Sequence, residues 1–282
     1  MHEGDARNMA FWDKLGTSGN VEDRRGAGLA IGGGTAVVGI VAYLILGALG
    51  VSVDPGLLQQ ILGGTSTGDT SQYEGKDDYE TFASSIIGST DEYWKQEFAT
   101  QNKPYTPAKL VLFRTATQSG CGVATSEVGP HYCPADQTIY LDETFFEVLK
   151  NQLGGSDDDV AQAYVIAHEA GHHAQYLLGI MDQVQADPNY GSTGENSLAV
   201  RVELQADCFA GLWAHSIRDR GVFEPGEINE AITAAGAVGD DRIQKSTEGQ
   251  INPETWTHGS AEQRVEAFNR GYNSGNFASC QL

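Results

Sequence analysis

The sequence predicts an α+β domain that is mostly helical, contains a small sheet and is preceded by one transmembrane helix. Three observations lead to this prediction. Apolar residues recur at helical spacing in several long segments, two short segments are rich in β-branched and aromatic residues, and residues 26–53 contain no charge. Residues 77–282 are numerous enough to form one domain with a single hydrophobic core.

The N-terminal part of the chain predicts a membrane anchor. Residues 26–53 are uncharged, and about 20 apolar residues suffice to cross a bilayer core. Arg24 and Arg25 precede this segment and Asp54 follows it, a charge pattern that favours a cytoplasmic N-terminus and an extracytoplasmic remainder. We therefore expect a single-pass membrane protein with a cytoplasmic segment at 1–25. A cleaved signal peptide is the alternative, although its leader would be long.

Between the expected anchor and the domain, residues 54–76 predict a flexible linker. The stretch from Gly63 to Lys76 is rich in Gly, Ser and Thr and has almost no apolar content. The globular domain, residues 77–282, should then begin with a helix. The expected helices are 77–98, 157–178, 195–220, 226–238 and 259–272, and the expected strands are 109–115 and 137–142.

The helix at 157–178 contains the pentapeptide His168-Glu169-Ala170-Gly171-His172, an HExxH motif. A helical repeat of 3.6 residues places both imidazoles on one face, where they can bind one zinc ion. Glu169 is then placed to take the proton of a zinc-bound water. An HExxH pentapeptide often occurs by chance in unrelated proteins. The prediction of a zinc site therefore depends on a third ligand.

The third zinc ligand is predicted on the next long helix. The extended pattern HExxHxxGxxH is excluded because Gln175 and Leu178 stand where it requires Gly and His. Glu203 and Asp207 lie four residues apart and share a helical face, so Glu203 can bind the metal while Asp207 accepts the outer N–H of a zinc histidine. Glu195 is the alternative ligand, but Ser192 to Glu195 reads as a helix-capping box. The alternative interpretation makes Glu203 and Asp207 ordinary flank charges.

Four cysteines follow the expected anchor, which agrees with an oxidising compartment. Four cysteines allow three pairings, and the sequence does not decide among them. We favour Cys121 with Cys133 and Cys208 with Cys280, and free buried thiols are the alternative. The chain has a net charge of −21, which would repel nucleic acid, so nucleic-acid binding is not expected.

Four sequence blocks together resemble a known family, the bacterial neutral zinc metallopeptidases, which are single-pass envelope proteins. The blocks are CGVATSEVGPHYCPADQTIYLD at 121–142, AQAYVIAHEAGHHAQ at 161–175, VRVELQADCFAG at 200–211 and THGSAEQRVEAFNRGY at 257–272. The resemblance implies a zincin-like, gluzincin-type core. It also implies one Zn²⁺ per chain bound by His168, His172 and Glu203, with Glu169 as the catalytic base.

A peptidase of this type also needs a donor for the oxyanion and a strand that pairs with the substrate. His258 is the preferred oxyanion donor because it opens the last helix near a glycine, and Tyr140 and His131 are the next choices. His173 and His215 are expected to be structural. Residues 137–142 are the expected substrate-pairing edge strand, with an internal strand as the alternative.

The sequence thus predicts a membrane-anchored, extracytoplasmic zinc peptidase that acts on a peptide or protein substrate. Two alternatives remain open. The chain could be a non-catalytic envelope interaction protein that keeps zinc for stability, against which Glu169 counts because a structural site has no use for a base. It could also be a zinc amidase that acts on a non-peptide or cell-wall amide.

Overall fold

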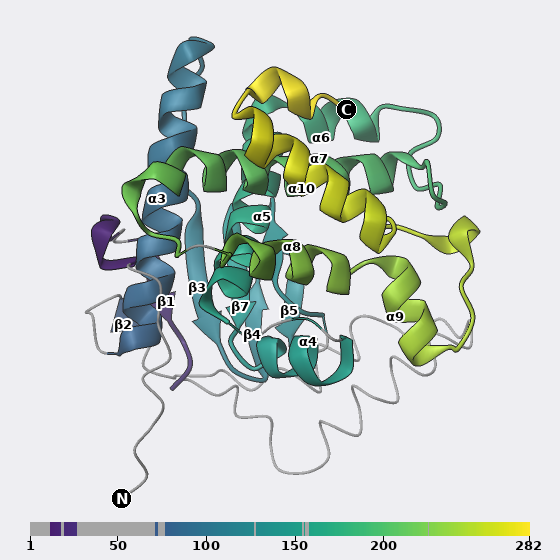
Figure 1. The fold of residues 1–282 in the computed structure, drawn as a ribbon, viewed down its shortest axis with the longest axis horizontal. Coiled ribbons are helices and arrows are strands. Elements are labelled where there is room, and N and C mark those ends of the chain that lie inside the picture. The colour runs from purple at the N-terminus through teal and green to yellow at the C-terminus, as the bar shows by residue number, and fades with distance from the viewer. Residues whose placement is uncertain are drawn as a thin grey trace, which may run out of the picture.

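The computed structural model describes residues 12–17, 20–26, 71–72, 77–126, 128–153, 155, 158–224 and 226–282. These residues form a mixed α/β fold in which helices predominate (Figure 1). The α-helices are α3 (Asp78–Thr100), α4 (Phe145–Leu153), α5 (Asp159–Leu178), α6 (Ile180–Gln185), α7 (Leu198–Ile217), α8 (Ile228–Ala237), α9 (Asp240–Thr247) and α10 (Ala261–Ser274). Short 3₁₀ helices are η1 (Trp12–Lys14), η2 (Arg218–Arg220), η3 (Pro253–Thr255) and η4 (Phe277–Cys280).

One five-stranded sheet has the order β2-β1-β3-β7-β6. Its centre is parallel, because β3 pairs in parallel with both β1 and β7, while β2 and β6 are antiparallel edge strands. The two strands expected from the sequence are confirmed as β3 and β7. The strands of the sheet are β1 (Val21–Asp23), β2 (Ser71–Gln72), β3 (Lys109–Phe113), β6 (His131–Cys133) and β7 (Thr138–Asp142).

The two faces of this sheet pack against different partners, because successive side chains of a strand point to opposite faces. Leu110 and Leu112 of β3 belong to the main core, which also contains residues of α3, α5 and α8. Val111 and Phe113 belong to a second cluster with Tyr140 of β7 and Ala124. Ala124 lies in a separate hairpin made of β4 (Ala116–Ser119) and β5 (Gly122–Thr125). The helices therefore lie on one face and the hairpin on the other.

The described N-terminal residues, 12–17 and 20–26, belong to the same fold, which corrects the predicted membrane topology. β1 lies inside the sheet, paired with β3, and α3 at the left of Figure 1 lies beside it. Trp12 is buried against Phe82 and Phe223, and its indole Nε1 donates to Asp159 at 2.7 Å. A single crossing between residues 25 and 77 would put β1 and β3 on opposite sides of a membrane. The predicted single-pass localisation is therefore wrong.

The expected transmembrane helix at 26–53 lies, apart from Gly26, outside the described residues. Among the residues that are described, no helix combines the length and the apolar character needed to cross a membrane. The part of the fold prediction that placed a transmembrane helix before the domain is corrected accordingly. Ser71 and Gln72, within the expected flexible linker, form β2 beside β1.

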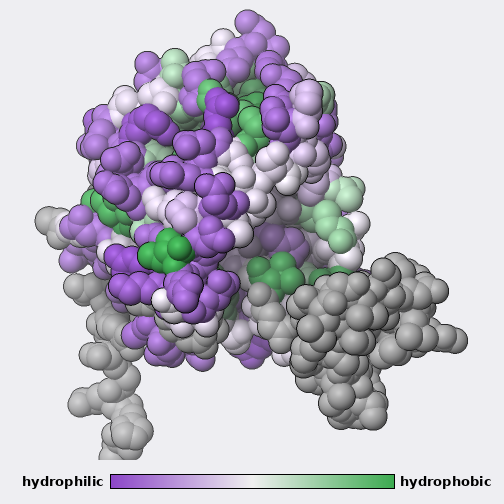
Figure 2. Space-filling model, turned by 90° about the vertical axis from the view of Figure 1, so that its right-hand side faces the viewer, coloured by the Kyte–Doolittle hydropathy of each residue, from purple (hydrophilic) through white to green (hydrophobic). Residues whose placement is uncertain are grey.

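Both preferred disulfides are confirmed. Cys121 pairs with Cys133, which ties the turn between β4 and β5 to β6, and Cys208 pairs with Cys280, which ties α7 to η4. None of the four cysteines is free. The surface shown in Figure 2 is mainly hydrophilic, and its hydrophobic residues lie in small separate groups. The most exposed large hydrophobic residues are Val128, Tyr190, Ile251 and Leu282.

Helices α5, α7 and α10 approach one another closely at glycines. A Cβ on Gly171 of α5 would lie 3.2 Å from the Ala206 carbonyl oxygen of α7. A Cβ on Gly211 of α7 would overlap the Phe268 carbonyl oxygen, and one on Gly271 of α10 would overlap that of Cys208. Only glycine lets backbones approach this closely. The three helices are thereby held near enough for side chains from all of them to meet.

Candidate metal centre

The three predicted zinc ligands lie together at the crossing of α5 and α7. His168, His172 and Glu203 each offer a ligand atom, and these atoms lie within 4.8 Å of one another. Nε2 of His168 is 3.3 Å from Glu203 Oε2, and Nε2 of His172 is 3.4 Å from Glu203 Oε1. Within the described part of the chain no other His, Cys, Asp or Glu group has this arrangement.

The local sequence explains this convergence. The two histidines occupy one face of α5 because they are one helical turn apart. Gly171, between them, allows α7 to approach at Ala206, and Glu203 is nearly one turn before Ala206. α7 begins at Leu198 because the side chain of Ser197 accepts from Val200 N, so Ser197 rather than the expected Ser192 caps the helix.

A buried charged network orients His168. Its Nδ1 lies 2.8 Å from Oδ1 of Asp207, as predicted for the outer partner of a zinc histidine. Asp207 is fully buried and also accepts from the hydroxyl of Tyr164 at 2.6 Å. Arg264 of α10 is only 4% exposed. It donates a hydrogen bond from Nε to Oδ2 of Asp207 and a second one from Nη2 to Oδ1, both at 2.9 Å. This bidentate contact is the strongest form of an arginine–carboxylate pair.

Electrostatics make the cluster a site for positive charge. Burial alone would raise the pKa of Asp207, but Arg264 and His168 hold it below its usual value. Burial opposes ionisation of Glu203 as well, yet the two histidines hold its pKa well below the usual value. Burial likewise opposes the imidazolium, but Asp207 and Glu203 raise the pKa of His168 to about 10. The buried carboxylate of Asp207 and the partly buried one of Glu203 thus stabilise positive charge on these rings, where a metal ion would be bound.

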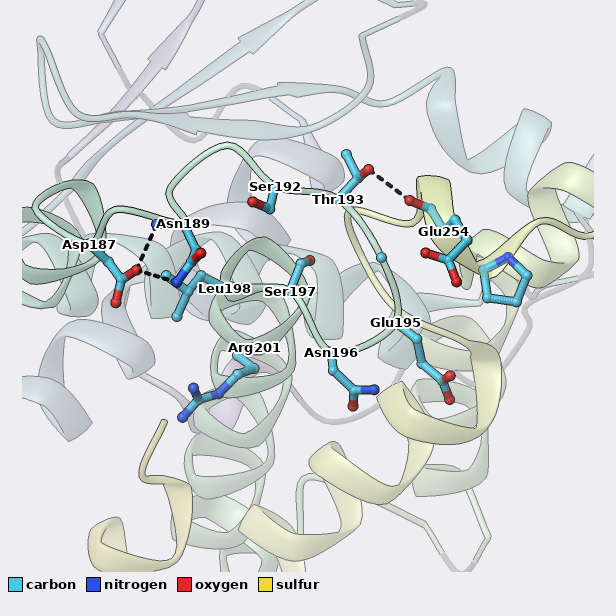
Figure 3. Close-up of a pocket in the computed structure, with 12 residues that line it drawn as sticks. Asp187, Asn189, Ser192, Thr193, Glu195, Asn196, Ser197, Leu198, Arg201 and Glu254 are labelled. Atoms are coloured by element: carbon cyan, nitrogen blue, oxygen red, sulfur yellow. Dashed lines mark hydrogen bonds between the residues drawn. The ribbon is translucent and has the colours of Figure 1, made fainter.

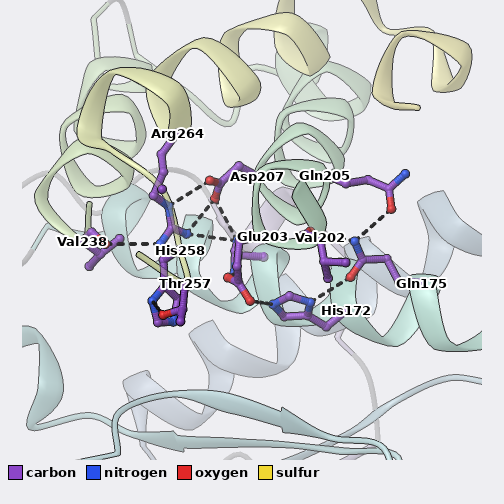
Figure 4. Close-up of polar contacts among 12 residues, drawn as sticks. His172, Gln175, Val202, Glu203, Gln205, Asp207, Val238, Thr257, His258 and Arg264 are labelled. Carbon is purple, nitrogen blue, oxygen red and sulfur yellow. Dashed lines mark hydrogen bonds and ion pairs between the residues drawn. The ribbon is translucent and has the colours of Figure 1, made fainter. Parts of the chain in front are cut away.

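A neutral network orients His172. Its Nδ1 lies 2.8 Å from Oε1 of Gln175, one turn further along α5 (Figure 4). The amide nitrogen of Gln175 donates to the Val202 carbonyl at 2.8 Å and to Oε1 of Gln205 at 2.9 Å. Since an amide oxygen only accepts, Nδ1 of His172 carries a proton, so Nε2 is the ring nitrogen available to a metal ion.

The residues present fit a zinc ion. Both imidazoles have their Nδ1 atoms engaged by an acceptor, so Nε2 is the nitrogen that each ring offers to a metal ion, and both Nε2 atoms face the Glu203 carboxylate. Two histidine nitrogens and one carboxylate form a donor set that catalytic zinc sites use, with one position left for water or substrate.

Glu169, the predicted base, follows His168 on α5 and is 7% exposed. Its charge is close enough to contribute to the raised pKa of His172, after the opposing effect of burial and the larger effect of Glu203. A carboxylate therefore lies beside the three ligand residues without being one of them.

His258, the predicted oxyanion donor, precedes α10. Asp240 fixes this segment: its Oδ2 accepts from the backbone N–H of Thr257, His258 and Gly259, and its Oδ1 lies 3.2 Å from Nδ1 of His258. A Cβ on Gly259 would lie 3.1 Å from the Val200 side chain, so the segment packs on α7 one turn before Glu203. In Figure 4 the His258 ring and the Glu203 carboxylate both lie below Arg264.

Several other candidates lie elsewhere. Glu195 lines a separate polar cavity of about 540 Å³ beside the start of α7, together with Arg201 and Glu254 (Figure 3). His131 stacks on Tyr140, which belongs to the cluster on the hairpin side of the sheet, opposite α5. Glu195, His131 and Tyr140 are therefore not assigned to the metal centre.

The two histidines expected to be structural have structural contacts. His173 is buried, with Nδ1 2.9 Å from the Tyr132 hydroxyl of β6 and Nε2 2.7 Å from the Thr106 carbonyl oxygen. His215 lies near the end of α7, with its Nδ1 2.6 Å from the Tyr272 carbonyl oxygen.

The expected substrate-pairing strand at 137–142 is internal. It forms β7, which pairs with β3 on one side and β6 on the other. β6 is the edge strand on this side of the sheet, and the contact between Tyr132 and His173 ties it to α5. A strand that pairs with substrate beside the metal helix would therefore be β6 rather than β7.

Sequence reasoning did not find Tyr164, Gln175 and Arg264, although each leaves a signal. Tyr164 precedes His168 by four residues and Gln175 follows His172 by three, so both share the helical face of a ligand. Arg264 interrupts the apolar stripe of α10, whose buried members are Ala267, Phe268 and Gly271. An arginine within such a stripe needs a buried acidic partner.

Comparisons with known proteins agree with this site. The sequence model of a family described as "Putative neutral zinc metallopeptidase" matches residues 9–282. The uncharacterized protein YpfJ of Escherichia coli is 43% identical over 282 residues, which cover 95% of this chain and 97% of that protein. The uncharacterized protein Mb2605 of Mycobacterium bovis is 45% identical over 202 residues, 68% of this chain and 66% of that protein.

No solved structure shows a significant match to the chain. The family match includes the HExxH helix, the Glu203 helix and α10, so all residues that form the candidate centre lie inside it. The chain therefore belongs to the neutral zinc metallopeptidase family.

Proposed function

We propose that this protein is a zinc-dependent peptidase that hydrolyses peptide bonds with a water activated by Glu169. The observation that carries the proposal is the orientation of the two imidazoles. Both direct Nε2 toward the carboxylate of Glu203, while their Nδ1 atoms are engaged by Asp207 and Gln175. This arrangement favours one metal ion per chain, held by His168, His172 and Glu203.

When bound at this position, zinc supplies Lewis acidity, which polarises a carbonyl group and lowers the pKa of a water to about 7. The protein supplies the proton transfers. Glu169 takes a proton from the attacking water and returns it to the leaving amine, the dual role of a general base and general acid. Its 7% exposure keeps bulk water from competing for this proton.

His258 is proposed to stabilise the negative charge that develops on the carbonyl oxygen. Asp240 accepts from the segment around His258 through both carboxylate oxygens, so the ring is held in place before substrate binds. With Nδ1 directed at Asp240, Nε2 is the ring atom left to face a substrate carbonyl oxygen. The side chain of His258 is 50% exposed, which leaves it accessible to a substrate.

An extended peptide is the proposed substrate, and β6 is the proposed strand for its main chain. Among the described strands, β6 pairs only with β7, and Tyr132 joins it to α5 through His173. Addition of a substrate strand to a sheet edge is a common way to bind peptides. A non-peptide amide would not need this edge. Cleavage of non-peptide amides as fast as that of peptides would therefore favour an amidase.

The proposal is tested with Glu169→Gln, which keeps the size of the side chain and removes its basicity. We expect hydrolysis of a peptide library to fall about 10²- to 10⁴-fold while zinc still binds at one per chain. Glu262→Gln, an exposed glutamate of α10, is the matched control and should keep full activity. Undiminished cleavage by Glu169→Gln would eliminate the catalytic role. Zinc binding by an inactive wild type would favour the alternative, a non-catalytic protein that keeps zinc for stability.

A further inference from the structure

Three hydrogen bonds in series join His172 to the C-terminal end of the chain. Nδ1 of His172 lies 2.8 Å from Oε1 of Gln175, and Nε2 of Gln175 donates to Oε1 of Gln205 at 2.9 Å. Nε2 of Gln205 then donates to the backbone carbonyl of Cys280 at 2.7 Å. Gln175 is fully buried and Gln205 is 5% exposed, so bulk water does not replace these contacts.

The direction of the series follows from its last member. A backbone carbonyl only accepts, so Gln205 must turn its amide nitrogen to Cys280 and its oxygen to Gln175. Gln175 must then turn its nitrogen to Gln205 and its oxygen to His172. The carbonyl of Val202 imposes the same orientation, because it also accepts from Nε2 of Gln175.

We propose that Gln205 and the C-terminal tail, residues 277–280, position His172 as a metal ligand by fixing its Nδ1–H tautomer. This inference rests on the proposed metal site. An oxygen presented to Nδ1 requires the proton on that atom, so the lone pair of Nε2 points toward Glu203. Gln175 and Gln205 are positioning residues, since neither faces the metal cluster directly.

The tail is held firmly enough to serve as an anchor. Cys280 is bonded to Cys208 of α7, only one turn beyond Glu203, and both cysteines are buried. Phe277 stacks on Phe209 with ring centroids 5.4 Å apart and meets Trp94 edge to face at 6.4 Å. The Cys280 carbonyl is therefore fixed relative to the helix that carries Glu203 and Gln205.

The test compares Gln205→Leu with Gln205→Glu in the full chain. Leu removes the acceptor that faces Gln175, and loss of an outer hydrogen-bond partner typically lowers metal affinity about 10- to 100-fold. Because Val202 still holds Gln175, we expect the lower end, about 10-fold. Glu keeps an oxygen toward Gln175 but loses the N–H that the Cys280 carbonyl accepts, so its zinc affinity should fall clearly less than that of Gln205→Leu. Competition of zinc against a chromophoric chelator measures both.

Two controls separate positioning from general loss of stability. Ser89→Ala removes a different buried hydrogen bond to α7, from Trp213 Nε1 at 2.9 Å, and should leave zinc affinity unchanged. Imidazole ¹⁵N spectra of the zinc-loaded protein give the second control. In Gln205→Leu the Nδ1 proton of His172 should exchange faster with solvent, whereas that of His168, which is bound to Asp207, should not change.

The role of the tail is tested by replacing Cys208 and Cys280 together with Ala. We expect weaker zinc binding in the direction of Gln205→Leu, and combining the disulfide variant with Gln205→Leu should add little, because both act through one path. Fully additive effects, or wild-type affinity in Gln205→Leu, would overturn the inference while leaving the metal site intact. A wild-type protein that binds no zinc would instead overturn the proposed function.

Discussion

The two histidines of the HExxH motif have supports of opposite character. His168 is oriented by charged groups. It contacts the buried carboxylate of Asp207, which in turn accepts from the buried guanidinium of Arg264 and the hydroxyl of Tyr164. His172 is oriented by neutral side-chain amides. Backbone carbonyls fix which end of each amide donates, and this leaves the oxygen of Gln175 facing the ring of His172. One motif on one helix therefore depends on two mechanisms, with α10 contributing the guanidinium to the first and the C-terminal tail contributing to the second.

The difference predicts how each support fails. Removing one member of a buried ion pair leaves an uncompensated charge, whereas removing one amide leaves unsatisfied but neutral groups. The charged support should therefore dominate the stability of the fold. The neutral support should be visible mainly in metal binding.

The largest effect is expected for Arg264→Met, which preserves much of the volume and removes the charge that balances Asp207. We expect the free energy of unfolding to fall by roughly 3–5 kcal/mol, measured by urea denaturation of the metal-free protein. Arg264→Lys should recover only part of this loss, because an ammonium group does not contact both carboxylate oxygens as the planar guanidinium does. If Arg264→Met lowered the free energy of unfolding by less than Gln175→Leu does, the charged support would not dominate stability.

An intermediate effect is expected for Gln175→Leu. The change leaves Nδ1–H of His172, the Val202 carbonyl and Oε1 of Gln205 without their present partner. We expect a loss of about 1–3 kcal/mol in the same denaturation experiment, together with zinc affinity lowered about 10- to 100-fold. Unchanged zinc affinity would show that the amide support does not orient His172.

The smallest effect is expected for Arg220→Met, which breaks an ion pair of the same chemistry at the surface. Arg220 contacts Glu92 with its two terminal nitrogens at 2.9 and 3.1 Å, but 38% and 47% of the two side chains are exposed. Exposed pairs contribute about 0–1 kcal/mol, and salt screens them. If Arg220→Met destabilised the protein as much as Arg264→Met, burial could not explain the special weight of the Asp207 pair.

The pairing of candidate metal-site residues within each helix could be predicted from sequence because helical spacing decides which residues share a face. His168 and His172 on α5, and Glu203 and Asp207 on α7, are pairs of this kind. The supporting residues on other elements could not be assigned in this way. Arg264 reaches Asp207 only because α10 crosses α7 at Gly211 and Gly271, and no spacing within either helix encodes that contact.

The topology was mispredicted for a related reason. The segment from Val21 to Asp23 is too short and too polar to be predicted as a strand. The uncharged run that begins at Gly26 also indicated a membrane boundary there. The place of β1 in the sheet comes from parallel pairing with β3, almost ninety positions later. Such pairing depends on the whole fold rather than on local pattern, as does the internal position of β7.

The position of Arg264 has a consequence for how the protein is made. Arg264 and Cys280 follow Glu203, the last of the three candidate ligand residues, by 61 and 77 positions. A protein is synthesised from its N-terminus, and its helices can begin to associate as they emerge. Until α10 leaves the ribosome, Asp207 lacks its guanidinium partner, and only His168 and Tyr164 compensate the burial of its charge. The charged support of His168 is thereby completed only after all three candidate ligand residues have emerged.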